Sequence, residues 1–349
     1  MNRSGYWLVL CLCAGVSTVQ AQIGGSSSFQ VLQAVSPARM AALGGNNLAV
    51  KDGDLNLGLY APSLMDSTAS GQIALGFNRI FGEASLSHAG FAQHVSGLGT
   101  LSFGITSLSY GTFDMTDEAG NQIGSFNAGE YLFQAGISRQ LDEYFSIGAN
   151  AKFALSEMAE YRATALLVDM SATYYNKEKH LTATLMMRNI GRTLSSYRPG
   201  VEENLPFEIQ AGISKKLDKA PIRFGVMYEN GQVWRLSEDR SGQFTTDPLT
   251  GEEVPVANDG FLETLGRHLV FNTEILLSEN IHLRAGYNYN RRQELKIDTR
   301  PGTGGFTYGI AIKVSKFHLS YARATYNLAG ATNHFGLSIK FDDFKRAEG

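Results

Sequence analysis

The residue types that could do chemistry are few, and their spacing fits no catalytic pattern. A serine esterase places its nucleophile between two glycines, whereas Gly124-Ser125-Phe126, Gly24-Gly25-Ser26 and Ser241-Gly242 all lack that arrangement. The seven histidines form no His-x-x-x-His pair and no other metal-ligand spacing. We therefore expect no catalytic residue, no metal site and no cofactor, and we expect that the protein is not an enzyme.

Both cysteines lie in an N-terminal stretch with the pattern of a secretory signal peptide. Arg3 supplies a positive charge, an apolar run extends from Tyr6 to Val16, and Val19-Gln20-Ala21 offers small residues before a cleavage site. Removal of residues 1–21 would leave no cysteine for a disulfide or a thiolate metal ligand. The alternative is that this run forms a buried helix of the mature fold.

The amino-acid composition excludes several further classes of protein. The 349 residues are 43% hydrophobic and 18% charged, which argues against disorder. The 30 basic and 33 acidic residues give no positive field, so we expect no nucleic-acid partner. Beyond residue 21 no apolar run reaches the roughly 18 residues of a membrane-spanning helix. An exported protein of this kind is soluble in the periplasm, released, or a barrel in an outer membrane.

The elements that must position any site are predicted from an alternation of apolar with polar or small residues. Phe145 to Phe153 and Ile281 to Tyr289 are two clear examples. Successive side chains of a strand point to opposite faces, so each such segment predicts a strand with one apolar face. About fourteen segments show this pattern, at 71–80, 83–95, 98–110, 129–141, 143–157, 160–176, 179–190, 206–218, 220–236, 264–278, 280–295, 304–315, 317–328 and 331–341.

The strands suit a membrane barrel better than a soluble sandwich, although both would alternate in this way. Their length matches the roughly ten tilted residues that cross the hydrocarbon layer, and tyrosines such as Tyr110 and Tyr174 recur near strand ends. Short connections alternate with longer links near 111–127, 191–205, 237–263 and 296–303. We predict an all-β fold: a transmembrane antiparallel outer-membrane β-barrel of about 14 strands with an N-terminal lumenal plug segment.

The predicted organisation has four parts. Residues 1–21 are the signal peptide, 22–70 an N-terminal plug or periplasmic segment, 71–344 the barrel and 345–349 a tail. The second part is rich in glycine and alanine, lacks the strand period and includes a helical turn at 37–43. It could fill the lumen as a plug or remain a partly ordered periplasmic tail.

Polar residues on the inner face are the next candidates. Their predicted members are Asn150, Lys152, Arg188, Glu208, Gln210, Arg223, Glu229, Arg284, Asn288, Asn290, Lys313 and Lys340. Because both signs of charge are present, we favour cross-strand pairs that stiffen the barrel and hold the plug over a charge-selective solute path.

The longest non-periodic stretch, from Leu236 to Leu262, is the candidate docking loop. Long surface loops on a rigid scaffold commonly bind partners, and the acidic spacing does not fit a helix-loop-helix calcium site. The loop is simply solvated, or it is a partner contact together with 111–127 and 191–205, or it binds an ion. The candidate partner-docking residues are Asp239, Arg240, Phe244, Asp247, Glu252, Glu253 and Phe261.

Two resemblances add to this interpretation. The series Ala38-Arg39, Leu43-Gly44-Gly45, Asp54 and Ala61-Pro62 resembles the start of the fatty-acid-transporter-like outer-membrane barrels, which have fourteen strands and a lumenal plug. A longer ordered series resembles the PorQ family over nearly the whole chain from Gln22 to Phe344. Its members include Thr116-Asp117-Glu118-Ala119-Gly120-Asn121, Ser138-Arg139-Gln140-Leu141-Asp142 and Arg188-Asn189-Ile190-Gly191-Arg192.

The resemblance to the PorQ family implies a non-catalytic component of the type IX secretion system of Bacteroidota, in the cell outer membrane. It would anchor an attachment complex whose other members are a PorZ-like surface protein, a PorU-like sortase and a PorV-like barrel. Those partners remove the sorting domain of cargo and join the cargo to lipopolysaccharide, so outer-membrane lipid and lipopolysaccharide are expected neighbours. The alternative is a fatty-acid-transporter-like channel for hydrophobic solutes.

Overall fold

The structure is a computed structural model that describes residues 28–201, 203–237, 244–246, 253–255, 258–296, 302–327 and 330–345. The predicted signal peptide at 1–21 and most of the predicted tail at 345–349 lie outside the described residues. Among the helices of the described part, none has the length and apolar character needed to cross a membrane.

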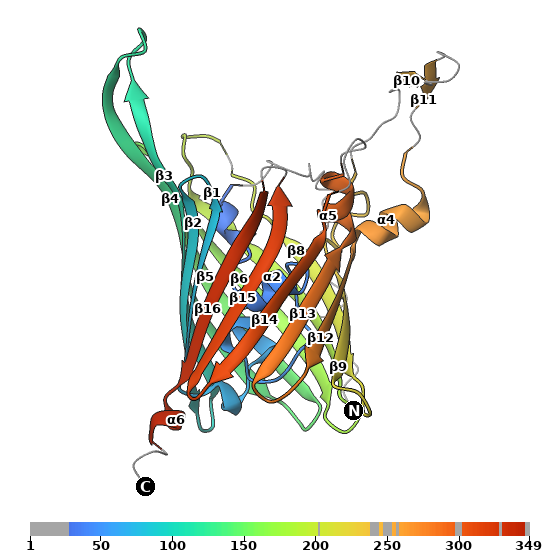
Figure 1. Ribbon diagram of the computed structural model, residues 1–349. Coiled ribbons are helices and arrows are strands. Elements are labelled where there is room, and N and C mark those ends of the chain that lie inside the picture. Colours follow the sequence, from blue (N-terminus) through green and yellow to red (C-terminus); the bar gives the residue numbers. More distant parts are fainter. Residues whose placement is uncertain are drawn as a thin grey trace, which may run out of the picture.

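Fourteen strands of the described part close into one antiparallel barrel (Figure 1). They are β1 Gln72–Phe81, β2 Ala84–Val95, β3 Gly99–Thr116, β4 Gln122–Gln140, β5 Phe145–Met158, β6 Tyr161–Asn176, β7 Leu181–Ser195, β8 Glu208–Lys216, β9 Ile222–Tyr228, β12 Leu269–Leu276, β13 Ile281–Asn288, β14 Phe306–Val314, β15 Phe317–Asn327 and β16 Gly330–Lys340. The barrel closes where β1 pairs with β16, from Gln72 opposite Lys340 to Arg79 opposite Asn333. The predicted all-β antiparallel barrel of about fourteen strands is confirmed.

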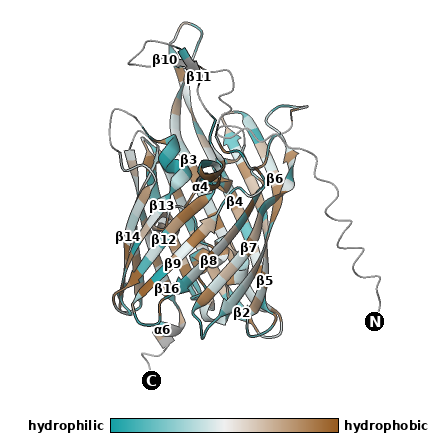
Figure 2. Ribbon diagram, turned by 90° about the vertical axis from the view of Figure 1, so that its right-hand side faces the viewer, coloured by the Kyte–Doolittle hydropathy of each residue, from teal (hydrophilic) through white to brown (hydrophobic). Residues whose placement is uncertain are grey.

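Apolar residues recur along the strands (brown in Figure 2), and many of them are exposed on the outer wall. Leu75, Phe103, Phe153, Leu185 and Phe271 are exposed by 38 to 53% on five different strands. A soluble protein rarely leaves so continuous an apolar surface in water, whereas the hydrocarbon of a bilayer surrounds it favourably. The outward apolar and inward polar faces define a membrane-spanning barrel of the outer-membrane type.

The two ends of the barrel differ in the lengths of their connections. At one end β6 and β7 are joined by residues 177–180, β12 and β13 by 277–280, and β14 and β15 by 315–316. At the other end the link from β9 to β12 contains β10 Phe244–Thr246, β11 Glu253–Pro255 and α4 Phe261–Arg267. Outer-membrane barrels keep short turns in the periplasm and long loops outside, so the end that carries α4 is the external end.

Several predicted boundaries are wrong at the external end. The stretch 111–127 continues β3 and β4 as paired strands, because cross-strand pairing persists beyond the barrel wall. The predicted strand 220–236 stops at Tyr228, and the strand predicted at 264–278 starts only at Leu269, after α4. The strand predicted at 280–295 ends at Asn288, whose side chain caps α5 Tyr289–Glu294 by accepting from the Arg291 N–H at 2.9 Å.

The N-terminal segment, residues 28–70, lies inside the barrel (Figure 1). Its short helices are η2 Gln30–Leu32, α2 Ala38–Ala42, α3 Leu55–Tyr60, η3 Pro62–Leu64 and η4 Ser67–Ala69. Helix α2 contacts β13 to β16, whereas α3 contacts β1 to β3 and η3 contacts β4 to β6. Asp54 caps α3 by accepting from the Asn56 N–H at 2.9 Å.

Glycines on the inner wall let this segment approach the strand backbones. A methyl group at Gly286 of β13 would clash with the backbone of Leu43 and Gly44, just after α2. At Gly148 of β5 it would lie 2.5 Å from the carbonyl carbon of Pro62 and 2.6 Å from the Ser63 nitrogen. The close contacts explain why the inner face mixes glycine with charged residues, since bulkier side chains would exclude the segment. A last short helix, α6 Asp342–Lys345, follows β16.

Candidate functional site inside the barrel

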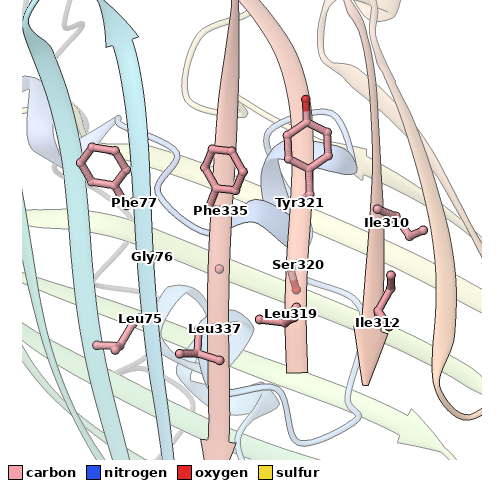
Figure 3. Close-up of a pocket in the computed structure, with 11 residues that line it drawn as sticks. Leu75, Gly76, Phe77, Ile310, Ile312, Leu319, Ser320, Tyr321, Phe335 and Leu337 are labelled. Carbon is pink, nitrogen blue, oxygen red and sulfur yellow. The ribbon is translucent and has the colours of Figure 1, made fainter. Parts of the chain in front are cut away.

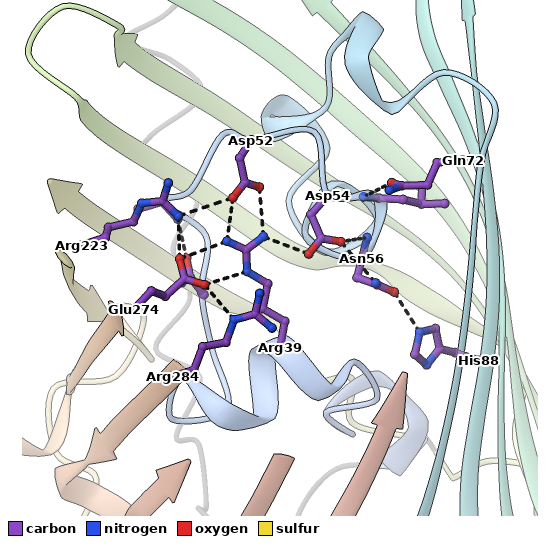
Figure 4. A network of polar contacts seen from close by, with 12 residues as sticks. Arg39, Asp52, Asp54, Asn56, Gln72, His88, Arg223, Glu274 and Arg284 are labelled. Carbon is purple, nitrogen blue, oxygen red and sulfur yellow. Dashed lines mark hydrogen bonds and ion pairs between the residues drawn. The ribbon is translucent and has the colours of Figure 1, made fainter. Parts of the chain in front are cut away.

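Inside the barrel, a cluster of charged side chains surrounds the buried Arg39 of α2 (Figure 4). The Arg39 guanidinium donates to both oxygens of Glu274 in β12, each at 3.0 Å. It also donates to both oxygens of Asp52, at 3.0 and 2.7 Å, and to Asp54 at 2.9 Å. Arg39 is only 6% exposed, so its charge is balanced almost entirely by these three carboxylates.

Glu274 in turn receives hydrogen bonds from two arginines of the wall. Arg223 of β9 donates to Oε2 at 2.5 Å, and Arg284 of β13 donates to Oε1 at 2.9 Å. Both arginines lie directly opposite Glu274 in the strand register. The cluster therefore contains three arginines and three carboxylates, and it joins α2 to three neighbouring strands. Removing one partner from such a buried group leaves an uncompensated charge, which is strongly destabilising.

A hydrogen-bonded chain continues from this cluster to the opposite wall. Asn56 donates from Nδ2 to Asp54 at 3.2 Å, and its Oδ1 lies 2.9 Å from Nε2 of His88 in β2. The other ring nitrogen of His88 lies 2.5 Å from the hydroxyl of Ser36, just before α2. A serine beside a histidine could suggest nucleophilic chemistry, but both residues are buried and the N-terminal segment covers them. These hydrogen bonds link the N-terminal segment to β2.

A second group of charges holds the end of α3. Arg188 of β7 donates to the Tyr60 hydroxyl at 2.7 Å and to the Leu32 carbonyl at 3.1 Å, and its guanidinium lies 4.1 Å from the centre of the Tyr60 ring. Nearby, Lys152 of β5 and Asp169 of β6 form a buried ion pair. The wall thus contacts the N-terminal segment with charged groups on two sides of the lumen.

Most of the predicted inner-face residues lie where the alternation places them. Asn150 donates to the Leu59 carbonyl at 2.8 Å and Lys340 to the Thr68 carbonyl at 2.9 Å, so both contact the N-terminal segment. Lys152, Arg188, Arg223 and Arg284 form ion pairs with wall residues, as the pairing hypothesis expects. The prediction is wrong for Asn290, which lies in α5 and donates to Glu294 at 2.8 Å, because the strand ends two residues earlier.

The alternation of residues along the chain does not reveal Glu274, Asp52 or the central role of Arg39. A single acidic residue at an inward position of β12, flanked by arginines on the neighbouring strands, was the available clue. This clue can be used only when the strand register is known, and the sequence pattern alone does not give the register.

An apolar cluster lies in the external half of the lumen, against β2 to β6. Phe29, Val31 and Leu32 pack there against inward side chains of the wall: Leu86, Leu108, Leu132, Ala154, Ala163, Ala165 and Leu167. The Val31 N–H donates to Glu130 of β4 at 2.7 Å, and Glu130 also accepts from the Tyr110 hydroxyl at 3.0 Å. Side chains of the N-terminal segment thus occupy this apolar part of the lumen.

A groove of about 450 Å³ lies on the outer side of the wall, across β1, β16, β15 and β14 (Figure 3). Phe77, Phe335 and Tyr321 align across three strands on one side of it, and an aliphatic row formed by Leu75, Leu337 and Leu319 aligns on the other. The groove faces the lipid. The paired β1 and β16 separate it from the lumen, so it is not a passage through the wall.

The candidate docking loop is described only in part. Asp239, Arg240, Asp247 and Glu252 lie outside the described residues. Phe244 and Glu253 lie on the β10–β11 hairpin, and Phe261 begins α4 with its ring 5.4 Å from that of Trp234. Trp234 stacks on the buried His268, which stacks on Tyr228. The structure gives Phe261 an aromatic support, and its role in docking remains a prediction.

The side chains of the described part include no group of three His, Cys, Asp or Glu residues placed to hold a metal ion. The charged cluster around Arg39 and the apolar cluster around Phe29 can bind and position segments of the chain.

Comparisons with known proteins show only that the fold is similar to that of some solved structures. No protein-family model matches the chain, and no curated protein matches it. Among solved structures, the TodX monoaromatic hydrocarbon channel deltaS2 mutant is 14% identical with a TM-score of 0.49 and covers 89% of this chain and 98% of its own. The toluene transporter TodX of Pseudomonas putida is 12% identical with a TM-score of 0.48 (86% and 96% covered). A FadL homologue of Pseudomonas aeruginosa is 10% identical with a TM-score of 0.47 (89% and 99% covered).

Proposed function

We propose that this protein is a non-catalytic outer-membrane barrel whose N-terminal segment is a plug that keeps the lumen closed, so that the barrel serves as a surface anchor for partner proteins. The observation that carries the proposal is the buried cluster of Arg39, Asp52 and Glu274, which ties the segment to three strands. Opening a conducting path would require these charges to separate, at a large cost in free energy because Arg39 and Glu274 are buried.

The finer proposal is a PorQ-like role in type IX secretion. Its support is the ordered series of residue segments that resemble that family along the mature chain. The partners would then be the PorZ-like, PorU-like and PorV-like proteins of the attachment complex, bound at the external loops. Nothing in the cluster calls for catalysis by the barrel itself.

The test is affinity purification of the tagged full-length protein from detergent-solubilised outer membranes, followed by mass spectrometry and by conductance measurements in planar bilayers. The proposal expects stoichiometric recovery of a surface partner and no steady conductance. A barrel that comes out alone, or that conducts ions without any denaturant, would contradict it. Repeating the purification with residues 237–260 deleted tests whether the candidate docking loop makes the contact.

A second candidate is a channel for hydrophobic solutes, and the apolar pocket around Phe29 favours it. If residues 28–32 withdrew, the inward leucines of β2, β3, β4 and β6 would line a site suited to an apolar ligand. The neighbours described above include hydrocarbon channels, although at 10 to 14% identity their ligands are not transferred.

Binding measurements separate the two candidates. Radiolabelled toluene and oleate are titrated onto the purified wild-type barrel and onto Phe29→Ala, which vacates part of the pocket. Saturable binding that strengthens in the variant would favour the channel. An anchor with a permanently filled lumen binds neither probe in the wild-type form.

A further inference from the structure

Strands β3 and β4 extend beyond the barrel as a free two-stranded ribbon, seen projecting above the wall in Figure 1. The last pair between β2 and β3 is Ser85 with Ser109, and the last between β5 and β4 is Met158 with Ala128. Beyond these points β3 and β4 pair only with each other, from Gly111 opposite Ala128 to Thr116 opposite Gln122. A bulge at Tyr110 marks the point where the ribbon leaves the wall.

The ribbon has stabilising contacts of its own, both in its turn and between its two strands. Asp117 fixes the turn by accepting from the N–H groups of Ala119 and Asn121, at 3.0 and 2.8 Å, and from the Asn121 side chain at 2.9 Å. The rings of Phe113 and Phe126 stack across the two strands, with centres 5.5 Å apart. An isolated hairpin is normally marginal in water, so these contacts preform a two-stranded surface.

The outer edge of β4 over residues 122–127 is unprotected. Proteins shield exposed strand edges with lysine, proline or a covering element, and residues 111–128 contain no lysine, arginine or proline. On the β3 side Glu83 approaches the edge, where its carboxylate accepts from the Thr112 N–H at 3.4 Å. On the β4 side no strand of the described part lies beside residues 122–127. Within the described part of the chain, the outward backbone donors and acceptors of this edge have no strand partner.

The charge of the ribbon indicates which kind of strand it accepts. Asp114, Asp117 and Glu118 give it three negative charges and no compensating cation. Two copies of this ribbon would repel each other, whereas a strand that carries lysine or arginine would be attracted. The half-exposed Phe113 and Met115 add an apolar face for the partner to cover.

We propose that the β4 edge at residues 122–127 binds an extended, lysine- or arginine-bearing segment of a surface partner protein as an added β-strand. Main-chain hydrogen bonds would supply the attachment and the acidic side chains its selectivity. The inference deepens the proposed anchoring function and rests on it, because an anchor needs a surface that partners can reach.

The experiment places the photo-reactive residue p-benzoylphenylalanine at Ser125 in the full-length protein in intact cells, with Thr303 as a control on the exposed link between β13 and β14. The proposal expects cross-links from position 125 to one extended basic segment, mapped by mass spectrometry, and none above background from position 303. The double variant Asp114→Asn, Glu118→Gln should lower the yield at least threefold. Equal yields at both positions, cross-links to a second copy or to lipid, or an unchanged yield in the double variant would overturn it.

A second variant separates this inference from the anchoring function. Residues 112–126 are replaced by Asn-Gly, which leaves the barrel pairs intact, and heat-modifiable gel migration checks that the barrel is folded. The proposal expects at least a tenfold loss of the surface partner in affinity purification. Undiminished recovery overturns the ribbon contact and leaves the anchor standing, whereas a wild-type barrel that recovers no partner overturns both.

Discussion

Arg39 and Glu274 lie 235 positions apart in the chain and meet inside the barrel through two hydrogen bonds of 3.0 Å. One residue belongs to a five-residue helix and the other to the wall. A helix of that length is not stable by itself, so tertiary contact decides its place. The pair therefore holds α2 against β12 and makes the segment part of the barrel's stable structure.

Glu274→Gln should lower the free energy of unfolding by about 3 kcal/mol, because three arginines would lose the carboxylate that compensates them. Urea unfolding from lipid vesicles measures the change. The matched control is Glu157→Gln, whose partner Arg162 is 68% exposed, and it should cost less than about 1 kcal/mol. Equal losses of unfolding free energy in the two variants would show that the buried cluster stabilises the protein no more than an exposed ion pair does.

Gly148→Ala should displace the N-terminal segment, because the added methyl group would lie 2.5 Å from the Pro62 carbonyl carbon. Backbone atoms cannot yield as a flexible side chain would, so we expect faster hydrogen exchange around residues 60–66. Gly124→Ala is the control, since a methyl group there meets nothing within 4 Å. Unchanged exchange in Gly148→Ala would argue against close packing of the segment on β5.

Phe29→Ala should destabilise the docking of residues 28–33 by about 3 kcal/mol, since Phe29 is fully buried in the apolar part of the lumen. Limited proteolysis near residue 30 should become at least tenfold faster. Phe77→Ala removes the same group from the lipid-facing wall and should leave that proteolysis unchanged. Resistance of both variants would mean that other contacts alone hold the segment.

The stability of the external rim should depend on pH through Glu229, one residue beyond β9. Burial, together with the negative charge of Glu208, raises the pKa of Glu229 from its ordinary 4.5 to about 7. The folded protein therefore binds a proton that the unfolded chain has lost between these pH values. The stability given by the protonated form is fully present below pH 4.5 and is lost as the pH rises through 7.

Glu229→Gln should remove this component. We expect the difference in unfolding midpoint between wild type and variant to grow in favour of the variant from about pH 5 to pH 8. Urea titrations in vesicles at several pH values measure it. A difference that stays constant over this range would show that Glu229 is ionised throughout.

The barrel wall can be predicted from the amino-acid sequence alone. The alternation around Phe145–Phe153 follows from the covalent geometry of a single strand, whose side chains point alternately to two faces, so it can be interpreted without knowing any neighbour. The same local rule placed Asn150, Lys152 and Arg284 inside. It failed at Asn290, where a capped helix replaces the strand, because side-chain capping competes with strand pairing over a few residues.

Which inward charges meet depends on how the strands and the N-terminal segment come together in the folded barrel. Glu274 lies opposite Arg223 and Arg284 because of the strand register, and Arg39 reaches it because the chain folds back into the closed barrel. A shift of one residue in the register would turn Glu274 to the lipid. Likewise, the length of the β3–β4 ribbon depends on where β2 and β5 stop pairing. Such long-range contacts depend on closure and register, and these arise only when all fourteen strands are assembled.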